Sequence, residues 1–221
     1  MTKKTKPVIG HYNPADLITM AGLICSVVAC FLLAQGHYIV SMVFYIITLL
    51  CDTFDGKVAR HLQIKDPHEK SYGIQLDSLC DMVSFGIVPC VMAFFLGYNG
   101  AFDVIIYAIF ATCGAIRLAH YNTDAVLAKP GEKHDSFVGL PIPQSCMYFI
   151  LMLDIHLLTV TADGVNGFVH WLFRLFFLGL AVAFILRFRF PRPNKFVMMF
   201  LGIWMLAQFL ALIIIVIAKG Y

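Results

Sequence analysis

Long apolar runs separated by short polar segments make up most of this 221-residue chain. An α-helix needs about 20 mostly apolar residues to cross the ~30 Å hydrocarbon core of a bilayer, and each run approaches that length. The pattern therefore predicts an all-α, polytopic transmembrane helical bundle of about seven spans, give or take one. The predicted spans lie near 17–36, 38–55, 76–97, 101–121, 142–161, 167–187 and 196–218.

The composition agrees with a chain that lies in the lipid bilayer. Hydrophobic residues make up 60% of the sequence and charged residues only 13%, whereas about one quarter of the residues in a soluble domain are charged. We therefore expect residues 1–221 to form a single integral membrane domain, with no room for a large soluble domain. We expect no nucleic-acid partner.

The basic residues indicate which way the chain crosses the membrane. Thirteen of the sixteen Lys and Arg residues fall in alternate connections, namely the N-terminal segment and the segments 56–70, 122–138 and 187–195. Cytoplasmic loops carry an excess of Lys and Arg, so these segments are expected inside, together with the N-terminus, and the C-terminus outside. We expect a multi-pass protein of the plasma membrane.

Four aspartates lie at the expected cytoplasmic ends of spans two and three. The chain reads Asp52-x-x-Asp55-Gly56-x-x-Ala59-Arg60, then a polar linker, then Gly73-x-x-x-Asp77-x-x-x-Asp81. Acids within membrane spans are functional candidates by default, because an ionised carboxylate is unfavourable in hydrocarbon. Converging carboxylates repel one another unless cations lie between them, and oxygen ligands suit hard cations such as Mg²⁺, Mn²⁺ or Ca²⁺. The sequence therefore predicts a metal-dependent site at a membrane surface.

The spacing places each half of this segment on one helical face, because offsets of 3, 4, 7 and 8 residues share a face. Two antiparallel helices joined by a cytoplasmic hairpin can point both faces at one cavity. The small residues Gly56, Ala59 and Gly73 keep that cavity wide. Arg60 at its rim offers a planar fork for phosphate. Residues 52–81 thus predict a dinuclear carboxylate site that holds a diphosphate.

Intramembrane acids can also have roles other than metal binding. Helix packing explains a lone aspartate, and an ion-coupled transporter also uses such acids. A transporter is expected to show broken helices near the midplane in two related halves, whereas here the acids gather at one edge and no inverted repeat is visible. Two further charged residues have simpler readings: Asp154 a structural hydrogen bond, and Arg174 an interfacial anchor beside Trp171.

At these residues the sequence resembles the CDP-alcohol phosphotransferases, whose signature is D-x-x-D-G-x-x-A-R followed by G-x-x-x-D-x-x-x-D. Every signature position is filled here. The runs LDSLCDMVSFGIVP at 76–89, GAIRLAHYN at 114–122 and FVGLPIP at 137–143 resemble the phosphatidylserine-forming branch of that family. Three departures stand out: a spacer of twelve residues between Arg60 and Gly73, where seven or eight are usual, and His120 and Cys80 in place of Arg and Ala.

The resemblance implies an enzyme that converts CDP-diacylglycerol and L-serine to phosphatidylserine and CMP. It implies a site with two divalent metals, Mg²⁺ or Mn²⁺, and a homodimer. The implied metal ligands are Asp52, Asp55, Asp77 and Asp81, and Asp81 is also the implied general base. The implied CDP-binding residues are Gly56, Ala59, Arg60 and Gly73.

The acceptor site is the least determined part of the sequence. The carboxylate of serine needs a cation or a cluster of backbone N–H groups, and Arg117 lies at the cytoplasmic end of span four, with His120 and Asn122 close by. Arg117 also fits a topological anchor. Inositol phosphate, glycerol phosphate or an archaeal-type lipid remain alternatives, although a phosphorylated acceptor would be expected to recruit several basic residues.

Overall fold

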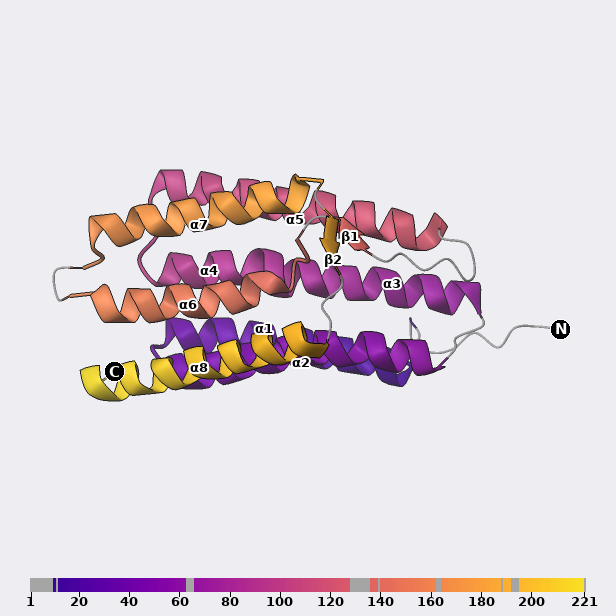
Figure 1. The fold of residues 1–221 in the computed structure, drawn as a ribbon, viewed down its shortest axis with the longest axis horizontal. Coiled ribbons are helices and arrows are strands. Elements are labelled where there is room, and N and C mark those ends of the chain that lie inside the picture. Colours follow the sequence, from indigo (N-terminus) through magenta and orange to yellow (C-terminus); the bar gives the residue numbers. More distant parts are fainter. Residues whose placement is uncertain are drawn as a thin grey trace.

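Helices that run along one common axis form almost the whole protein (Figure 1). The computed structural model describes residues 10, 12–62, 66–127, 136–138, 140–161, 164–187, 189–191 and 195–220. The elements are α1 (Pro14–Ala34), α2 (Tyr38–Leu62), α3 (Pro67–Asp81), the π-helix η1 (Met82–Ile87), α4 (Val88–Phe95), α5 (Ala101–Leu127), β1 (Ser136–Val138), α6 (Gln144–Thr159), α7 (Gly167–Ile185), β2 (Arg189–Pro191) and α8 (Lys195–Lys219).

The predicted polytopic helical bundle is confirmed. Within the described ranges, six helices are long and apolar enough to cross a membrane, and Gln144–Thr159 is a shorter apolar helix. Six of the seven predicted spans correspond to these helices, and the predicted span near 142–161 corresponds to the shorter helix of 16 residues. The α1–α2 and α4–α5 turns and the end of α8 lie at one end of the bundle, and the end of α2 and the start of α3 lie at the other (Figure 1).

Three helices extend further than their apolar runs. α2 continues to Leu62 rather than 55, α5 continues to Leu127 rather than 121, and α3 begins at Pro67 rather than 76. Hydropathy reports only the apolar part of a helix, so the predicted spans stop where polar residues begin although the backbone remains helical. In these polar extensions, α2, α3 and α5 continue past the start of α6 and the end of α7 (Figure 1).

Side-chain caps fix where α1 and α3 begin. Asn13 accepts a hydrogen bond from the amide of Asp16 at 2.9 Å, and Pro14 occupies the first turn of α1. Asp66 in the same way accepts from the amide of His68 at 3.0 Å, ahead of Pro67 in α3. Asn and Asp are preferred caps because their side chains satisfy amides that the first turn leaves without partners. Both starts border the cavity described below.

A π-helical turn, η1, follows directly after Asp81. Such turns disturb the regular ladder of an α-helix and are frequent at functional sites. Side chains from neighbouring helices bond to its carbonyl groups: Tyr45 donates to the Ser84 carbonyl at 3.2 Å, and Ser145 donates to the Phe85 carbonyl at 2.9 Å. These contacts from α2 and α6 hold the backbone immediately beyond Asp81 in a defined position.

The core lies between the helices, and large apolar side chains cover the outside. Tyr45 packs edge-on against Phe149, with ring centroids 6.1 Å apart, and both residues are fully buried. Phe102, Phe168 and Ile217 are more than two-thirds exposed. Exposed apolar side chains over most of the surface are what a bundle surrounded by lipid requires, because lipid satisfies them as well as a protein core does.

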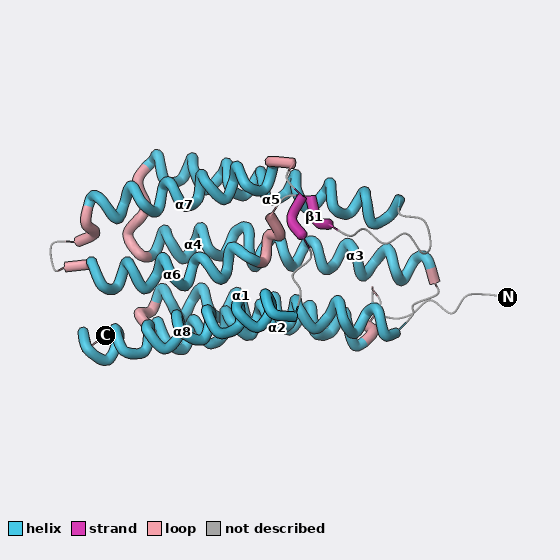
Figure 2. The backbone as a smooth tube through the Cα atoms, viewed as in Figure 1, coloured by secondary structure: helices cyan, strands magenta, loops and turns pink. Residues whose placement is uncertain are grey.

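A two-stranded antiparallel ribbon was not predicted. β1 pairs with β2 in the register Ser136↔Pro191, Phe137↔Phe190 and Val138↔Arg189. The ribbon joins the α5–α6 connection to the α7–α8 connection beside the long helices (Figure 2). Both connections therefore lie on the same side of the bundle, as the alternation of basic segments predicts.

Candidate metal and phosphate site

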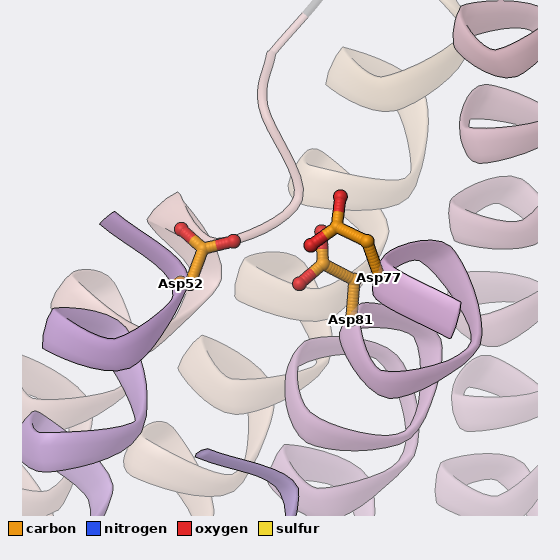
Figure 3. Close-up of side chains that lie close together, drawn as sticks. All are labelled: Asp52, Asp77 and Asp81. Carbon is orange, nitrogen blue, oxygen red and sulfur yellow. The ribbon is translucent and has the colours of Figure 1, made fainter. Parts of the chain in front are cut away.

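Three of the four signature aspartates converge between α2 and α3. Asp52 on α2, and Asp77 and Asp81 one turn apart on α3, each offer a carboxylate oxygen, and these three oxygens lie within 4.8 Å of one another. The side chains point into one shared space (Figure 3). The helical offsets explain this arrangement, because residues four apart on α3 share the face that meets α2.

No ion pair with a described basic residue compensates these three acids. Arg117 on α5 interacts with Asp81 only electrostatically, without a salt bridge, and the salt bridges seen among the described residues are those of Asp103. Asp52 and Asp81 approach each other within hydrogen-bonding distance. Carboxylates this close cannot all be ionised without a cation between them. A set of carboxylate oxygens that forms no such ion pair fits Mg²⁺ or Mn²⁺.

Asp55 lies outside this cluster and faces α1. Its carboxylate accepts a 2.6 Å hydrogen bond from the Thr19 hydroxyl, and only 4% of Asp55 is exposed. The structure therefore brings together three of the four predicted metal ligands and shows Asp55 held by a neutral donor. Thr19 was not foreseen, because nothing in the spacing of α1 marks it. The role of Asp55 as a metal ligand stays a prediction.

A cavity of about 390 Å³ opens beside the acids between α1, α2 and α3. All four predicted CDP-binding residues line it: Gly56, Ala59, Arg60 and Gly73. A side chain at Gly73 would crowd the cavity, since a Cβ there would lie 3.3 Å from Asp16 Oδ1. The remaining lining residues are Ala15, Asp16, Thr19, Asp55, Lys70, Ile74 and Asp77.

The wall formed by α1 was missed by sequence reasoning. Ala15, Asp16 and Thr19 lie in the first two turns of α1, and Asp16 is only 4% exposed. The one available signal was the helix-start pattern Asn13-Pro14, which places a polar first turn at the same end of the bundle as the signature. In the sequence, a polar first turn that lines a cavity looks the same as any polar segment that precedes an apolar helix.

The three residues predicted for the acceptor do not share one cavity. Arg117 and His120 line a second cavity of about 210 Å³ between α5 and the end of α7, together with Arg187. Asn122 instead accepts a 2.9 Å hydrogen bond from Ser78 on α3. Arg117 is 9% exposed, and its Nε has no hydrogen-bond partner among the described residues. Arg187 joins this site, although the sequence marked it only as part of a basic connection.

Two isolated charges have surroundings that the sequence did not specify. Arg174 lies over the Trp171 ring at 4.9 Å, and its Nε also donates to Asp103 at 2.7 Å, so its role as an interfacial anchor stays a prediction. Asp154 was expected to form a structural hydrogen bond, but neither of its buried carboxyl oxygens has a hydrogen-bond partner in the described ranges. Periodicity does not report such pairings, because they depend on which helices become neighbours.

Comparison with known proteins gives a consistent result. Residues 12–219 match the profile of the CDP-alcohol phosphatidyltransferases. A CDP-diacylglycerol–serine O-phosphatidyltransferase of Helicobacter pylori is 29% identical over 191 residues, 86% of this chain and 76% of that protein. One of Saccharomyces cerevisiae is 40% identical over 143 residues, 60% of this chain and 50% of that protein. An archaetidylserine synthase of Methanothermobacter thermautotrophicus is 26% identical over 185 residues, 81% of this chain and 70% of that protein.

Proposed function

Because the chain belongs to the CDP-alcohol phosphatidyltransferase family, we propose that it transfers the phosphatidyl group of CDP-diacylglycerol to L-serine. The products are phosphatidylserine and CMP. The convergence of Asp52, Asp77 and Asp81, with no ion pair to a basic residue in the described part of the chain, is the observation that carries the proposal. The names of the relatives support serine as the acceptor, and the archaeal relative keeps an archaeal-type lipid as an alternative donor.

The acid cluster would hold the metals. Asp52, Asp77 and Asp81 are the first candidates, and Asp55 is the fourth. Divalent cations bound there, two of them by family resemblance, would neutralise the diphosphate and stabilise the departing CMP. The aspartates would keep this charge at the membrane edge, where a lipid donor and a water-soluble acceptor can both arrive.

The 390 Å³ cavity would receive the CDP moiety. Gly56, Ala59 and Gly73 leave room for the nucleotide to approach the helix backbones closely. Arg60 lines the same cavity and offers two parallel N–H donors to a phosphate. In this arrangement, the acid cluster would lie at the reacting phosphorus, and the cavity would hold the CMP part of the donor, which leaves in the reaction.

Asp81 would act as the general base. It takes the proton of the serine hydroxyl, and the oxygen forms a bond to the phosphorus that carries diacylglycerol. The bond between that phosphorus and CMP breaks, and CMP leaves with the electron pair. Asp81 is the residue of the cluster that adjoins η1, so the bonds from Tyr45 and Ser145 to that segment also position the base.

Arg117 would bind the serine carboxylate. A buried guanidinium whose Nε has no hydrogen-bond partner among the residues that the structure describes is suited to an incoming anion. A second candidate acceptor follows from the same cavity, because Arg117, His120 and Arg187 line it together. Such a set of basic side chains also suits the phosphate of inositol phosphate or glycerol phosphate.

The proposal includes an orientation and an assembly. The basic segments favour a multi-pass protein of the plasma membrane with the acid cluster at the cytoplasmic face. Family resemblance favours a homodimer. A fully active species of monomer size in detergent would exclude the dimer, and cysteine labelling from one side of sealed vesicles would test the orientation.

Incorporation of radiolabelled serine by the purified protein tests the activity. With CDP-diacylglycerol and Mn²⁺ or Mg²⁺, labelled phosphatidylserine should form, and excess chelator should stop the reaction until metal is restored. Inositol phosphate and glycerol 3-phosphate serve as competing acceptors in the same assay. Preferential use of either would overturn the serine assignment, and full turnover after verified metal removal would overturn the metal site.

Replacement of Arg117 by Ala tests the acceptor site. Loss of a partly buried charge-assisted hydrogen bond should lower kcat/KM for serine by ~30- to 1000-fold, roughly 2–4 kcal/mol. The KM for CDP-diacylglycerol should change little, because Arg117 does not line the CDP cavity. An equal loss for both substrates would show that Arg117 acts through the fold and does not bind serine.

A further inference from the structure

Lys70 lies in the CDP cavity although no signature position accounts for it. It lines the 390 Å³ cavity together with Arg60, and these are the two cationic side chains among the described lining residues. The same cavity also presents the carboxyl groups of Asp16, Asp55 and Asp77. Arg60 belongs to the signature, so the position of Lys70 in the same cavity needs a separate explanation.

The long spacer creates this position. The twelve residues between Arg60 and Gly73 include Pro67–Tyr72, which form the start of α3. The added helix continues the face that bears the acids, since Lys70 lies three residues before Gly73 and seven before Asp77. All three line the cavity. A spacer of the usual length would have less chain with which to build this turn.

Hydrogen bonds fix the backbone that carries Lys70. Its amide donates to the Asp66 carbonyl at 3.0 Å, within the turn that Asp66 caps. The neighbouring Glu69 accepts from Asn13 Nδ2 at 3.3 Å. Asn13 also caps α1 through its side-chain oxygen. One side chain therefore ties the α1 wall of the cavity to the turn that holds Lys70.

The distances along the helix suit a nucleoside diphosphate. At 1.5 Å of rise per residue, Lys70 lies about 10 Å from Asp77 along α3, and its side chain can cover part of that distance. Asp77 of the acid cluster lines the cavity and suits a metal, and Arg60 and Lys70 line the same cavity as cationic donors. A cytidine diphosphate group is long enough to contact both ends and offers phosphate and carbonyl acceptors to the cations.

We propose that Lys70 is a second cation, beside Arg60, that binds the cytidine diphosphate group of the lipid donor. This inference rests on the proposed function, because it assumes that the cavity receives CDP-diacylglycerol. Lys70 contributes to donor binding and not to serine binding. The long spacer is then a device that adds a ligand contact, not an inert loop.

Lys70→Ala, Lys70→Arg and Lys57→Ala test the proposal. Lys57 is the matched control, because it is an exposed lysine on α2 only three residues before Arg60 and does not line the cavity. Its ammonium group lies over the Phe54 ring at 5.1 Å. Lys70→Ala should raise the KM for CDP-diacylglycerol about tenfold, the size expected of a charge-assisted contact at a partly exposed site. The KM for serine should stay within twofold, and Lys70→Arg should retain most of the affinity.

Binding of radiolabelled CMP in the presence of Mn²⁺, without serine, separates this inference from the activity. Weaker CMP binding by Lys70→Ala, with Lys57→Ala like the wild type, supports the contact even if the acceptor is not serine. Equal effects of the two alanine variants would assign the change to general surface charge and overturn the proposal. Unchanged CMP binding and unchanged KM in Lys70→Ala would overturn it while leaving the transferase activity standing.

Discussion

Two parts of the bundle hold buried acids in opposite ways. Where α4 joins α5, Asp103 is 2% exposed and accepts hydrogen bonds from Arg174 Nε at 2.7 Å, His170 Nε2 at 2.7 Å and the Gly100 amide at 2.9 Å. Where α2 meets α3, Asp52, Asp77 and Asp81 face one another with no ion pair to a Lys, Arg or His in the described ranges. One acid is fully compensated by the protein, and the three others are not.

The difference separates a structural acid from a ligand-binding one. Asp103 joins the start of α5 to α7, and the adjacent Tyr98 ring stacks on Phe173 at 3.7 Å and hydrogen-bonds His156 at 2.9 Å. Both oxygens of Asp103 are engaged in this network, so an added ligand would find no free oxygen on Asp103. The acid cluster has the opposite character, because its charges repel one another and a bound cation would compensate them.

The largest effect is expected for Asp81→Asn. Loss of the general base should lower turnover by about 10²- to 10⁴-fold, while CDP-diacylglycerol still binds. The folded protein should be as stable as the wild type or more stable in metal-free buffer, because the change removes one of three repelling carboxyl groups. Steady-state rates and thermal unfolding in detergent measure the two effects.

Asp77→Asn is the matched variant on the same helix face. It should lower both turnover and metal-dependent donor binding, since Asp77 is assigned only to the metals. Near-normal turnover by Asp81→Asn would remove Asp81 from the base role. Marked destabilisation by Asp81→Asn would show that the cluster is compensated within the protein, and the contrast with Asp103 would fail.

Asp103→Asn should have the opposite pair of effects, namely lower stability and little change in activity. Removal of the Asp103 charge leaves Arg174 without its counter-ion and weakens the contact between α5 and α7, so the protein should lose stability. Activity per folded molecule should change little, because Asp103 lies in the first turn of α5, outside both the acid cluster and the lining of the CDP cavity. Thermal unfolding and assays of the folded fraction provide the two readings.

The double variant Asp103→Asn/Arg174→Met controls for the uncompensated charge and should recover part of the lost stability. A loss of activity that exceeds the loss of folded protein would contradict the purely structural assignment. It would instead point to coupling between the two parts of the bundle through α5 and α7.

Much of this architecture could be predicted because it depends on local pattern. Apolar runs predicted the long helices, and helical offsets predicted the shared face of Asp77 and Asp81. The short connection between α2 and α3 made an antiparallel hairpin, and with it a neighbouring Asp52, the expected arrangement. The four residues predicted to bind CDP all line one cavity for the same reason. The family assignment is confirmed by the match over residues 12–219.

The missed features depend on which helices become neighbours. Thr19 reaches Asp55 across 36 positions of sequence, and Arg174 reaches Asp103 across 71. The π-helical turn after Asp81 is stabilised by Tyr45 and by a residue of α6, so no local pattern marks it. Helix periodicity fixes a face but not its partner, which is why the α1 wall and the Asp103 network appeared only in the folded chain.

The smallest expected effect concerns Asp55, whose environment lies between these two extremes. Its partner is the neutral Thr19 hydroxyl, which donates at 2.6 Å and also approaches the Ala15 carbonyl at 3.1 Å. Thr19→Val keeps the shape of the side chain and removes the donor, which should cost about 1–2 kcal/mol. If Asp55 also serves the metals, the Mn²⁺ concentration for half-maximal activity should shift severalfold.

Thr19→Ser is the control for that measurement, because it keeps the hydroxyl and should behave like the wild type. A shift in Mn²⁺ dependence for Thr19→Val but not for Thr19→Ser would mean that α1 positions Asp55 for metal binding. A lower unfolding temperature for Thr19→Val, with unchanged Mn²⁺ dependence, would assign the bond to packing between α1 and α2. Asp55 would then belong with Asp103 as an acid satisfied by the protein, and the metal cluster would consist of the three acids that converge.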